Sequence, residues 1–233
     1  MRTLVLAVWF VTAVASGPPA QLPQILPVDA AAEDAPLRQA RDAALAAATA
    51  KNVDALLALV SPDLVLAEGS DLPKDRPRWL REALANPQHE WWRGLAESLA
   101  LGGAFTTARG AVEGRREFCA PYFFARFPTD VPAVVHGERP PWIIIDKDVA
   151  LHQRPDARSR VVARVSYALV QAESLEQPDP VTPRVLWDSV EYPENATSYV
   201  MASKIRNPER FHVCFANEPT GWRISLISPY RGL

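Results

Sequence analysis

The chain has 233 residues, of which 22% are charged, and its formal net charge at neutral pH is −2. This length suits one large domain or two small ones. The charges are spread along the chain without a basic block, so nucleic acid is not an expected partner. The 22 prolines indicate many loops and short elements rather than long regular ones.

Residues 1–15 have the pattern of a secretory signal peptide. Arg2 precedes an apolar run that ends in Ala13-Val14-Ala15, whose small side chains fit the A-x-A cleavage pattern. The run is shorter than the ~20 residues of a membrane-spanning helix. An uncleaved anchor or a buried N-terminal helix is the alternative interpretation. We expect a periplasmic or secreted protein without stable membrane insertion.

A linker and a first helix are expected after this segment. Residues 16–35 are rich in Pro and Ala and show no periodicity, which is typical of a linker. A helix is predicted to begin at Pro36, because Asp34 can cap it and Pro suits its first turn. Lys51 and Asn52 are predicted to end it, since Asn tolerates the left-handed conformation.

Further helices are predicted at 53–60, 77–85 and 88–101. Ser61-Pro62-Asp63 is expected to stop the first of these and Gly102-Gly103 the last. On the last helix, Trp91, Leu95 and Leu99 recur at helical spacing. Such a stripe is more often packed in a core than exposed in a ligand pocket.

From residue 105 the pattern changes to short β-type runs separated by Pro- and Gly-containing turns. The runs are 142–145, 149–152, 160–170, 185–190, 198–201, 211–216 and 222–227. Many short strands with such turns predict a small barrel or sandwich. The expected fold class is α+β, with a helical α+β domain at 36–136, a small all-β barrel at 137–207 and a C-terminal β-hairpin at 208–233.

Short stretches of the β region resemble a known family. They read V-A-L-H-Q-R-P-D at 149–156, R-V-V-A-R-V at 160–165, W-D-S-V at 187–190 and Y-V-M-A-S-K-I-R at 199–206. Residues 146–206 thereby resemble the bacterial Src-homology-3-like (SH3-like) domain of cell-envelope proteins. The chain departs from that family where His152 replaces a usual Arg and Ser198 a usual Gly. The segment 173–183 is also long and Pro-rich for the loop it occupies.

This resemblance implies a binding module. In such barrels Tyr and Trp side chains line the ligand groove, because they offer flat apolar faces with a polar edge. The candidates here are Trp187, Tyr199 and Tyr167, with packing in the core as the alternative for Trp187. Exported relatives contact peptidoglycan or neighbouring proteins, so the resemblance implies cell-wall peptidoglycan or an envelope protein as the partner.

The helical region resembles a second family. Residues 51–63 read K-N-V-D-A-L-L-A-L-V-S-P-D and are similar to a stretch of nuclear-transport-factor-2-like, cone-shaped domains. Those domains end in paired strands with a turn before W-x-I, as at 211–224 here. The resemblance implies that the C-terminal hairpin packs on the first domain, with the barrel inserted between. A small-molecule binder or hydrolase with a pocket in this cone is the alternative function.

The residues that could carry chemistry are few. Cys119 and Cys214 favour a disulfide in an oxidising compartment, with two buried thiols as the alternative. His212 would share a strand face with Cys214, but a disulfide would abolish that Cys–His pair. No nucleophile, metal or phosphate-loop motif is recognised. We therefore expect a binding protein without catalytic residues, metal or cofactor.

Overall fold

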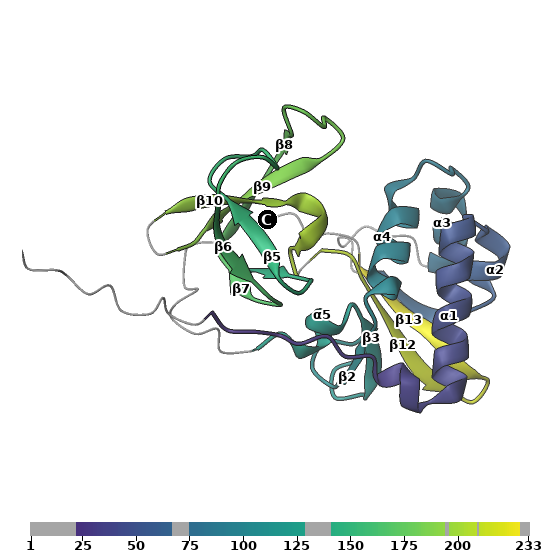
Figure 1. The fold of residues 1–233 in the computed structure, drawn as a ribbon. Helices are drawn as coiled ribbons and strands as arrows, with labels where there is room; N and C mark the ends of the chain where they lie inside the picture. Colours follow the sequence, from purple (N-terminus) through teal and green to yellow (C-terminus); the bar gives the residue numbers. More distant parts are fainter. Residues whose placement is uncertain (1–21, 67–74, 129–140, 194–195, 209, 229–233) are drawn as a thin grey trace, which may run out of the picture.

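The computed structural model describes residues 22–66, 75–128, 141–193, 196–208 and 210–228. The expected signal peptide at 1–15 lies outside the described residues. Within them the chain is mixed α+β, with five α-helices and three sheets. Figure 1 shows two parts, which we name the helical part (residues 30–126 and 212–228) and the β part (residues 142–206).

One five-stranded sheet forms the base of the helical part. Its order is β1 (Val60–Leu66), β13 (Gly221–Ser228), β12 (His212–Glu218), β3 (Glu117–Ala120) and β2 (Ala104–Thr106). β1 runs parallel to β13, and the other neighbours are antiparallel. The C-terminal hairpin β12–β13 thus completes a sheet whose other strands precede the β part, which is an insertion between β3 and β12.

Helices cover one side of this sheet (Figure 1). They are α1 (Ala35–Ala50), α2 (Val53–Leu57), α3 (Arg76–Leu84) and α4 (Glu90–Ala100). Asp34 caps α1 as predicted, because its side chain accepts the N–H of Leu37. The left-handed residue that ends α1 is Lys51, with φ of 55°, and not Asn52, which caps α2 instead.

The second predicted helix is shorter than its pattern indicated. α2 ends at Leu57, and the predicted stop signal Ser61-Pro62-Asp63 lies inside strand β1. β1 is an edge strand of the sheet. Pro is tolerated there because one side of an edge strand has no neighbour to hydrogen-bond. The helix prediction was therefore wrong beyond residue 57.

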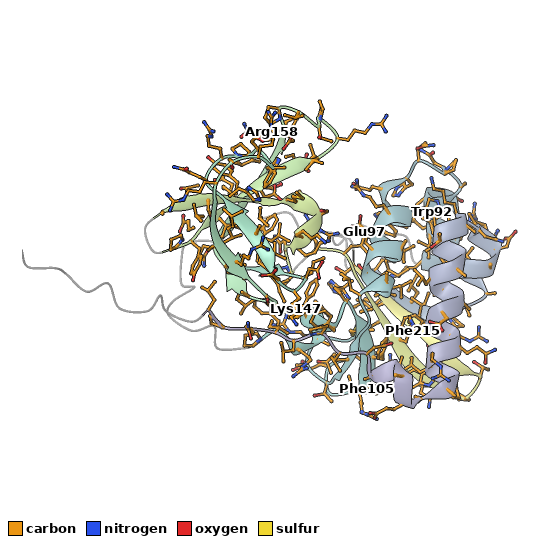
Figure 2. All side chains as sticks on the ribbon, viewed as in Figure 1. Trp92, Glu97, Phe105, Lys147, Arg158 and Phe215 are labelled. Atoms are coloured by element: carbon orange, nitrogen blue, oxygen red, sulfur yellow. A yellow bond between two sulfur atoms is a disulfide. The ribbon has the colours of Figure 1, made fainter. Side chains whose placement is uncertain are left out.

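A continuous apolar core lies between the helices and the sheet. The Trp91 stripe is part of it, since Trp91, Leu95 and Leu99 are all buried. Trp92 on α4 and Phe215 on β12, both labelled in Figure 2, are buried in the same cluster. The indole N–H of Trp92 donates to the carbonyl of Leu84 at 3.2 Å. The stripe is thus core, the first of the two interpretations of its spacing.

A glycine lets α4 approach the segment that leads into β12. A Cβ atom at position 94 would lie 2.4 Å from the ring of Phe211, so Gly94 is required by this contact. Glycine in a helix interior costs about 1 kcal/mol relative to Ala. Ser98, one turn further along α4, donates its hydroxyl to the carbonyl of Phe211 at 2.7 Å. Close packing therefore fixes α4 against the return of the chain from the β part.

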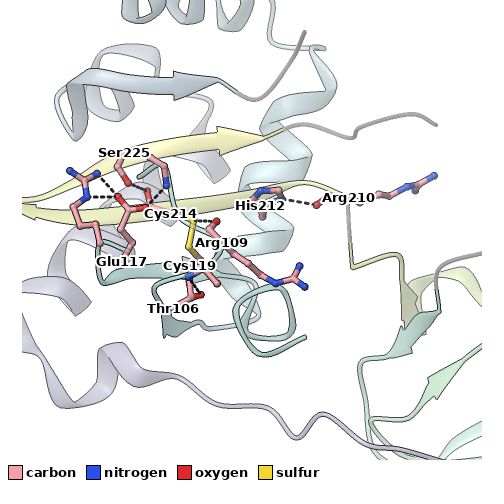
Figure 3. The surroundings of a disulfide bond; sticks show 11 residues. Thr106, Arg109, Glu117, Cys119, Arg210, His212, Cys214 and Ser225 are labelled. Carbon is pink, nitrogen blue, oxygen red and sulfur yellow. Dashed lines mark hydrogen bonds and ion pairs between the residues drawn. A yellow bond between two sulfur atoms is a disulfide. The ribbon is translucent and has the colours of Figure 1, made fainter. Parts of the chain in front are cut away.

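The two cysteines form a disulfide within the sheet (Figure 3). Cys119 on β3 and Cys214 on β12 face each other across neighbouring strands, and both are fully buried. They are 95 residues apart in sequence, so the bond closes a loop that contains the β part. The Cys–His pair with His212 is excluded, because neither sulfur is a thiol. The ring of His212 instead stacks on Phe124.

The β part contains two sheets. The larger has the order β6 (Val161–Val165), β5 (Val149–His152), β10 (Thr197–Met201), β9 (Leu186–Glu191) and β8 (Ala172–Pro178). The smaller has the order β11 (Ile205–Arg206), β4 (Trp142–Ile144) and β7 (Leu169–Val170). The 3-10 helix η3 (Ala202–Lys204) connects β10 to β11. Among the described residues, strand pairing closes neither sheet into a barrel.

Two expectations for the β part were wrong. The run 160–170 is not one strand, because Tyr167 has a φ of 51° and separates β6 from β7. Val161, at an apolar alternate position, is 39% exposed. The segment 173–183, expected as a loop, forms most of strand β8. β8 is an edge strand with exposed side chains, so it carries no apolar alternation.

The expected linker is packed from residue 22 onward. We name residues 22–33 the strap, which ends in the 3-10 helix η1 (Ala30–Glu33). The N–H of Ile25 donates to Tyr167 in the β part, and the N–H of Ala30 donates to Gly103 in the helical part, both at 2.9 Å. Ile25 is buried in a cluster with α5 (Tyr122–Arg126) and the small sheet. The strap therefore contacts both parts, and the expected linker is packed, not free, from residue 22 to the start of η1.

Candidate functional site

A cleft of about 770 Å³ lies between the two parts. One wall is formed by α4 and by Phe211. The opposite wall is formed by η3, β11 and the β8–β9 hairpin. Figure 2 labels Glu97 on the side of α4 that faces the β part. Residues more than 100 positions apart in sequence, such as Glu97 and Arg206, thus meet in one concave surface.

Arginine side chains from both walls meet in the cleft. Arg93 comes from α4, Arg206 from β11, and Arg210 from the segment before β12. Burial lowers the pKa of Arg206, and the positive charges of Arg210 and Arg93 lower it further. Glu97 and Asp188 act in the opposite direction. Arg93 and Arg210 thus add positive charge around Arg206, which favours an anion at this point of the cleft.

The guanidinium of Arg206 is held on one side by the backbone. Its Nη1 donates to the carbonyl oxygens of Ala202 at 3.0 Å and Ile205 at 2.8 Å. Its Nη2 lies 3.6 Å from the carboxylate of Glu97, beyond hydrogen-bond distance. Its Nε is buried and has no hydrogen-bond partner among the described residues. The Nε–Nη2 edge of this guanidinium is thus incompletely satisfied.

The carboxylates of the cleft differ in burial and in their hydrogen-bond partners. Asp188 is buried, and one of its oxygens accepts the N–H groups of Leu175 at 3.0 Å and Glu176 at 3.3 Å. Its charge therefore holds the β8–β9 hairpin in place. Glu97 is half-exposed, and among the described residues its carboxylate contacts Arg206 at 3.6 Å. Further acidic residues on the lining are Glu90 and Glu176.

Aromatic rings lie beside these charges. Trp91 and Phe211 pack edge to face, with ring centroids 5.9 Å apart, on the wall made by the helical part. On the other wall, the guanidinium of Arg210 lies 5.9 Å from the ring centroid of Trp142. Trp91 and Trp142 are buried, so the half-buried ring of Phe211 is the one of these three that offers a ligand an apolar face beside the arginines.

The structure places Trp187 in the interior. It is fully buried, its indole N–H donates to Asp179 at 3.2 Å, and its ring packs edge to face on His152. It therefore packs in the core rather than along an open groove. Tyr199 on β10 and Tyr167 in the turn after β6 are half-buried. None of the three lines the cleft between the two parts.

Asp179 organises two loops of the β part, a role that no sequence pattern predicted. It is 2% exposed, and its carboxylate accepts the N–H groups of Ala157, Thr182, Val181 and the Trp187 indole. These hydrogen bonds, led by the one from Ala157, lower its pKa to about 2. Asp179 thereby ties the loop before β6 to the loop between β8 and β9.

Metal sites and membrane-spanning helices can be searched for only among the described residues. In those ranges, no group of three or more His, Cys, Asp and Glu side chains is placed to hold a metal ion. None of the helices there has the length and apolar character that a membrane crossing requires. No family model matches the chain, and a search of curated proteins finds no match. The cleft between the two parts is therefore the candidate functional site.

Sequence reasoning missed the arginines of the cleft. Arg93 follows two tryptophans on a helix, and Arg206 was included only as the end of the closing SH3-like stretch. An arginine on a polar helix face is usually solvated, so neither residue has a pattern that distinguishes it. The insertion of the β part is what brings them together, and only the strand order shows this.

Proposed function

We propose that this chain is an exported, non-catalytic binding protein of the cell envelope that holds a segment of cell-wall glycopeptide in the cleft between its two parts. The observation that carries the proposal is the group of three cleft arginines beside the half-buried ring of Phe211. A glycopeptide presents sugar rings, methyl groups and carboxylates. Rings and methyl groups pack on aromatic faces, and carboxylates form charge-assisted hydrogen bonds with arginine.

Export is supported by two independent features. The N-terminal pattern Arg2, apolar run and Ala13-Val14-Ala15 is that of a signal peptide. The buried disulfide between Cys119 and Cys214 is of a kind that persists in oxidising compartments. Together they favour a periplasmic or secreted location.

The β part is proposed to be an SH3-like module. Support comes from the resemblance of 146–206 and from the short 3-10 helix η3 directly after β10, where that family has a one-turn helix. The β part supplies one wall of the cleft. We therefore propose that the β part is a binding module whose ligand lies in the cleft and not at the buried Trp187.

A protein partner is the second candidate. It is favoured by apolar side chains exposed on the β8–β9 hairpin, namely Leu175 at 42%, Leu186 at 36% and Val181 at 53%. The alternative of a pocket inside the helical part has less support. The large side chains Trp91, Trp92, Phe118 and Phe215 fill that interior.

Co-sedimentation with isolated peptidoglycan sacculi tests the first proposal. The protein from residue 16 onward is compared with Arg93→Ala, in the cleft, and with the matched variant Arg78→Ala on α3. Both arginines are exposed on helices of the helical part, and Arg78 does not line the cleft. We expect the wild type and Arg78→Ala to sediment, and retention of Arg93→Ala to fall at least threefold.

Two outcomes would contradict this proposal in different ways. If the wild-type protein stays in the supernatant, the proposal that it binds the cell wall is contradicted. Equal retention of all three proteins keeps cell-wall binding but removes the cleft as its site.

A further inference from the structure

We propose that the cleft recognises a free carboxylate of its ligand, which pairs with the Nε–Nη2 edge of Arg206. This inference rests on the proposed function, because it names the chemical group that the cleft binds. It applies to a peptide that ends in a carboxylate or carries one on a side chain.

The orientation of the Arg206 side chain is fixed before any ligand arrives. Arg206 lies on β11, which pairs with Ile143 of β4, so its backbone is part of the small sheet. The two carbonyl contacts of Nη1, to Ala202 and Ile205, then hold the end of the side chain. An arginine that is already ordered loses little rotamer freedom when it forms further hydrogen bonds.

The edge that remains matches a carboxylate. A guanidinium has five N–H donors, and the Nε–H and one Nη2–H point in the same direction. Two parallel hydrogen bonds to the two oxygens of a carboxylate satisfy such an edge. In Arg206 the buried Nε of this edge has no partner within the described part of the chain, and Nη2 lies 3.6 Å from the Glu97 carboxylate. Leaving a buried donor unpaired costs free energy, which a carboxylate would recover once the side chains that cover Nε have moved aside.

The Glu97 carboxylate competes with a ligand carboxylate for the guanidinium of Arg206. Its carboxylate lies beside the edge but too far away to hydrogen-bond with it, and its side chain is 49% exposed. It therefore lowers the cost of the buried charge without satisfying Nε. A ligand carboxylate must move Glu97 aside and overcome its negative charge. Removing that charge is expected to strengthen binding.

The surrounding charge favours an added anion at this point. Arg93 and Arg210 are close enough to Arg206 for their charges to lower its pKa, and Glu97 and Asp188 oppose them. Asp188 is already satisfied by the backbone N–H groups of the β8–β9 hairpin. Among the described residues, the cleft lining as a whole holds four arginines and four acidic residues, so their formal charges cancel over the whole cleft. Attraction for an anion is thus local to the group of three arginines.

The test uses a pair of small peptides that differ only in the group at issue. Acetyl-Ala-Ala with a free carboxylate and acetyl-Ala-Ala amide are titrated into the ¹⁵N-labelled protein from residue 16 onward. The arginine Nε–H resonances are followed by NMR, and the signal of Arg206 is assigned by its loss in Arg206→Lys. We expect the free acid to shift this signal in a saturable manner and the amide to leave it unchanged.

Variants sharpen the result. Arg206→Lys is expected to weaken binding of the free acid at least tenfold, because lysine cannot form the two parallel bonds. Glu97→Gln is expected to tighten it severalfold. The matched controls are Arg78→Lys and Glu82→Gln, the exposed Arg–Glu pair on α3, and they should change nothing. If Arg206→Lys does not fold, as its amide spectrum would show, the Arg206 Nε–H signal is assigned by through-bond correlation to its backbone amide, and the two peptides and Glu97→Gln then decide the question.

Several results would overturn the inference. Equal binding of acid and amide removes carboxylate recognition but keeps the cleft as a peptide site. A shift of the Arg206 signal by acetate at the same concentration, with the same affinity as the peptide acid, reduces the site to a non-selective anion contact. No response to either peptide also overturns it, and the sacculus experiment then decides the proposed function independently.

Discussion

The helical part and the β part hold themselves together by different means. In the helical part, a large apolar cluster runs from α1 to the sheet and contains Trp91, Trp92, Phe118 and Phe215, and a second cluster surrounds the disulfide. The β part has a smaller apolar cluster and relies on polar anchors such as Asp179. The short strands of the β part are thus stabilised partly through their loops. There a single buried carboxylate, that of Asp179, binds several backbone N–H groups at once.

The largest effect is expected from Trp187→Ala. Truncating a fully buried tryptophan leaves a cavity and removes one donor from Asp179, so the β part should lose about 3–5 kcal/mol of unfolding free energy. Residue-resolved hydrogen exchange measures this loss separately in each part. The matched variant Tyr199→Ala, on the neighbouring strand and half-buried, should cost much less. A folded Trp187→Ala protein of unchanged stability that no longer binds sacculi would make Trp187 a ligand contact instead.

The next effect concerns the helical part. Replacing Cys119 and Cys214 together by Ala removes a cross-link that closes a loop of 95 residues. We expect a loss of about 2–5 kcal/mol, which is the usual cost of removing a native disulfide. Hydrogen exchange should show this loss in β3, β12 and β13 and leave the β5–β10 pair nearly unchanged. An equal loss in both parts would mean that they unfold as one unit, and the comparison would then break down.

The smallest effect is expected from Asp179 and depends on pH. Because its folded-state pKa is about 2, below its ordinary value of 3.8, its contribution is fully present above about pH 4. This contribution is lost as the pH falls from about 4 towards 2. Urea unfolding at pH 7, 4 and 2.5 should therefore show Asp179→Asn as less stable than the wild type at pH 7, with the gap narrowing at pH 2.5. A gap that is constant with pH would mean that its charge does not stabilise the β part.

Sequence patterns predicted the helical part better than the β part. α1, α3 and α4 were predicted within a few residues, because a long element repeats its apolar period several times. The end of α2 and strand β1 were not, since five residues of helix and an edge strand give too few repeats. In the β part, β8 shows no alternation, and the positive φ of Tyr167 interrupts a run that reads as one strand.

The candidate site could be predicted from the sequence only in its general nature. The β region was expected to bind through a groove of its own, and this stays a prediction; the cleft described above lies instead between the two parts. The residues were not predicted, because Arg93 and Arg206 come from different parts and meet only through the insertion. Trp187 resembled a groove residue because large aromatic side chains serve both cores and grooves, and burial distinguishes them only in three dimensions.

The position of the disulfide has a mechanical consequence. The β part leaves the sheet after β3 and returns before β12, and the Cys119–Cys214 link lies one pair inside this junction, next to Ala120 and Val213. A force that pulled the β part away from the helical part would separate β3 from β12 starting at the Ala120–Val213 pair. It would meet a covalent bond at the next pair. Tension applied to the β part would thus be carried by this covalent bond at the start of the insertion, and β3 and β12 would stay paired beyond it.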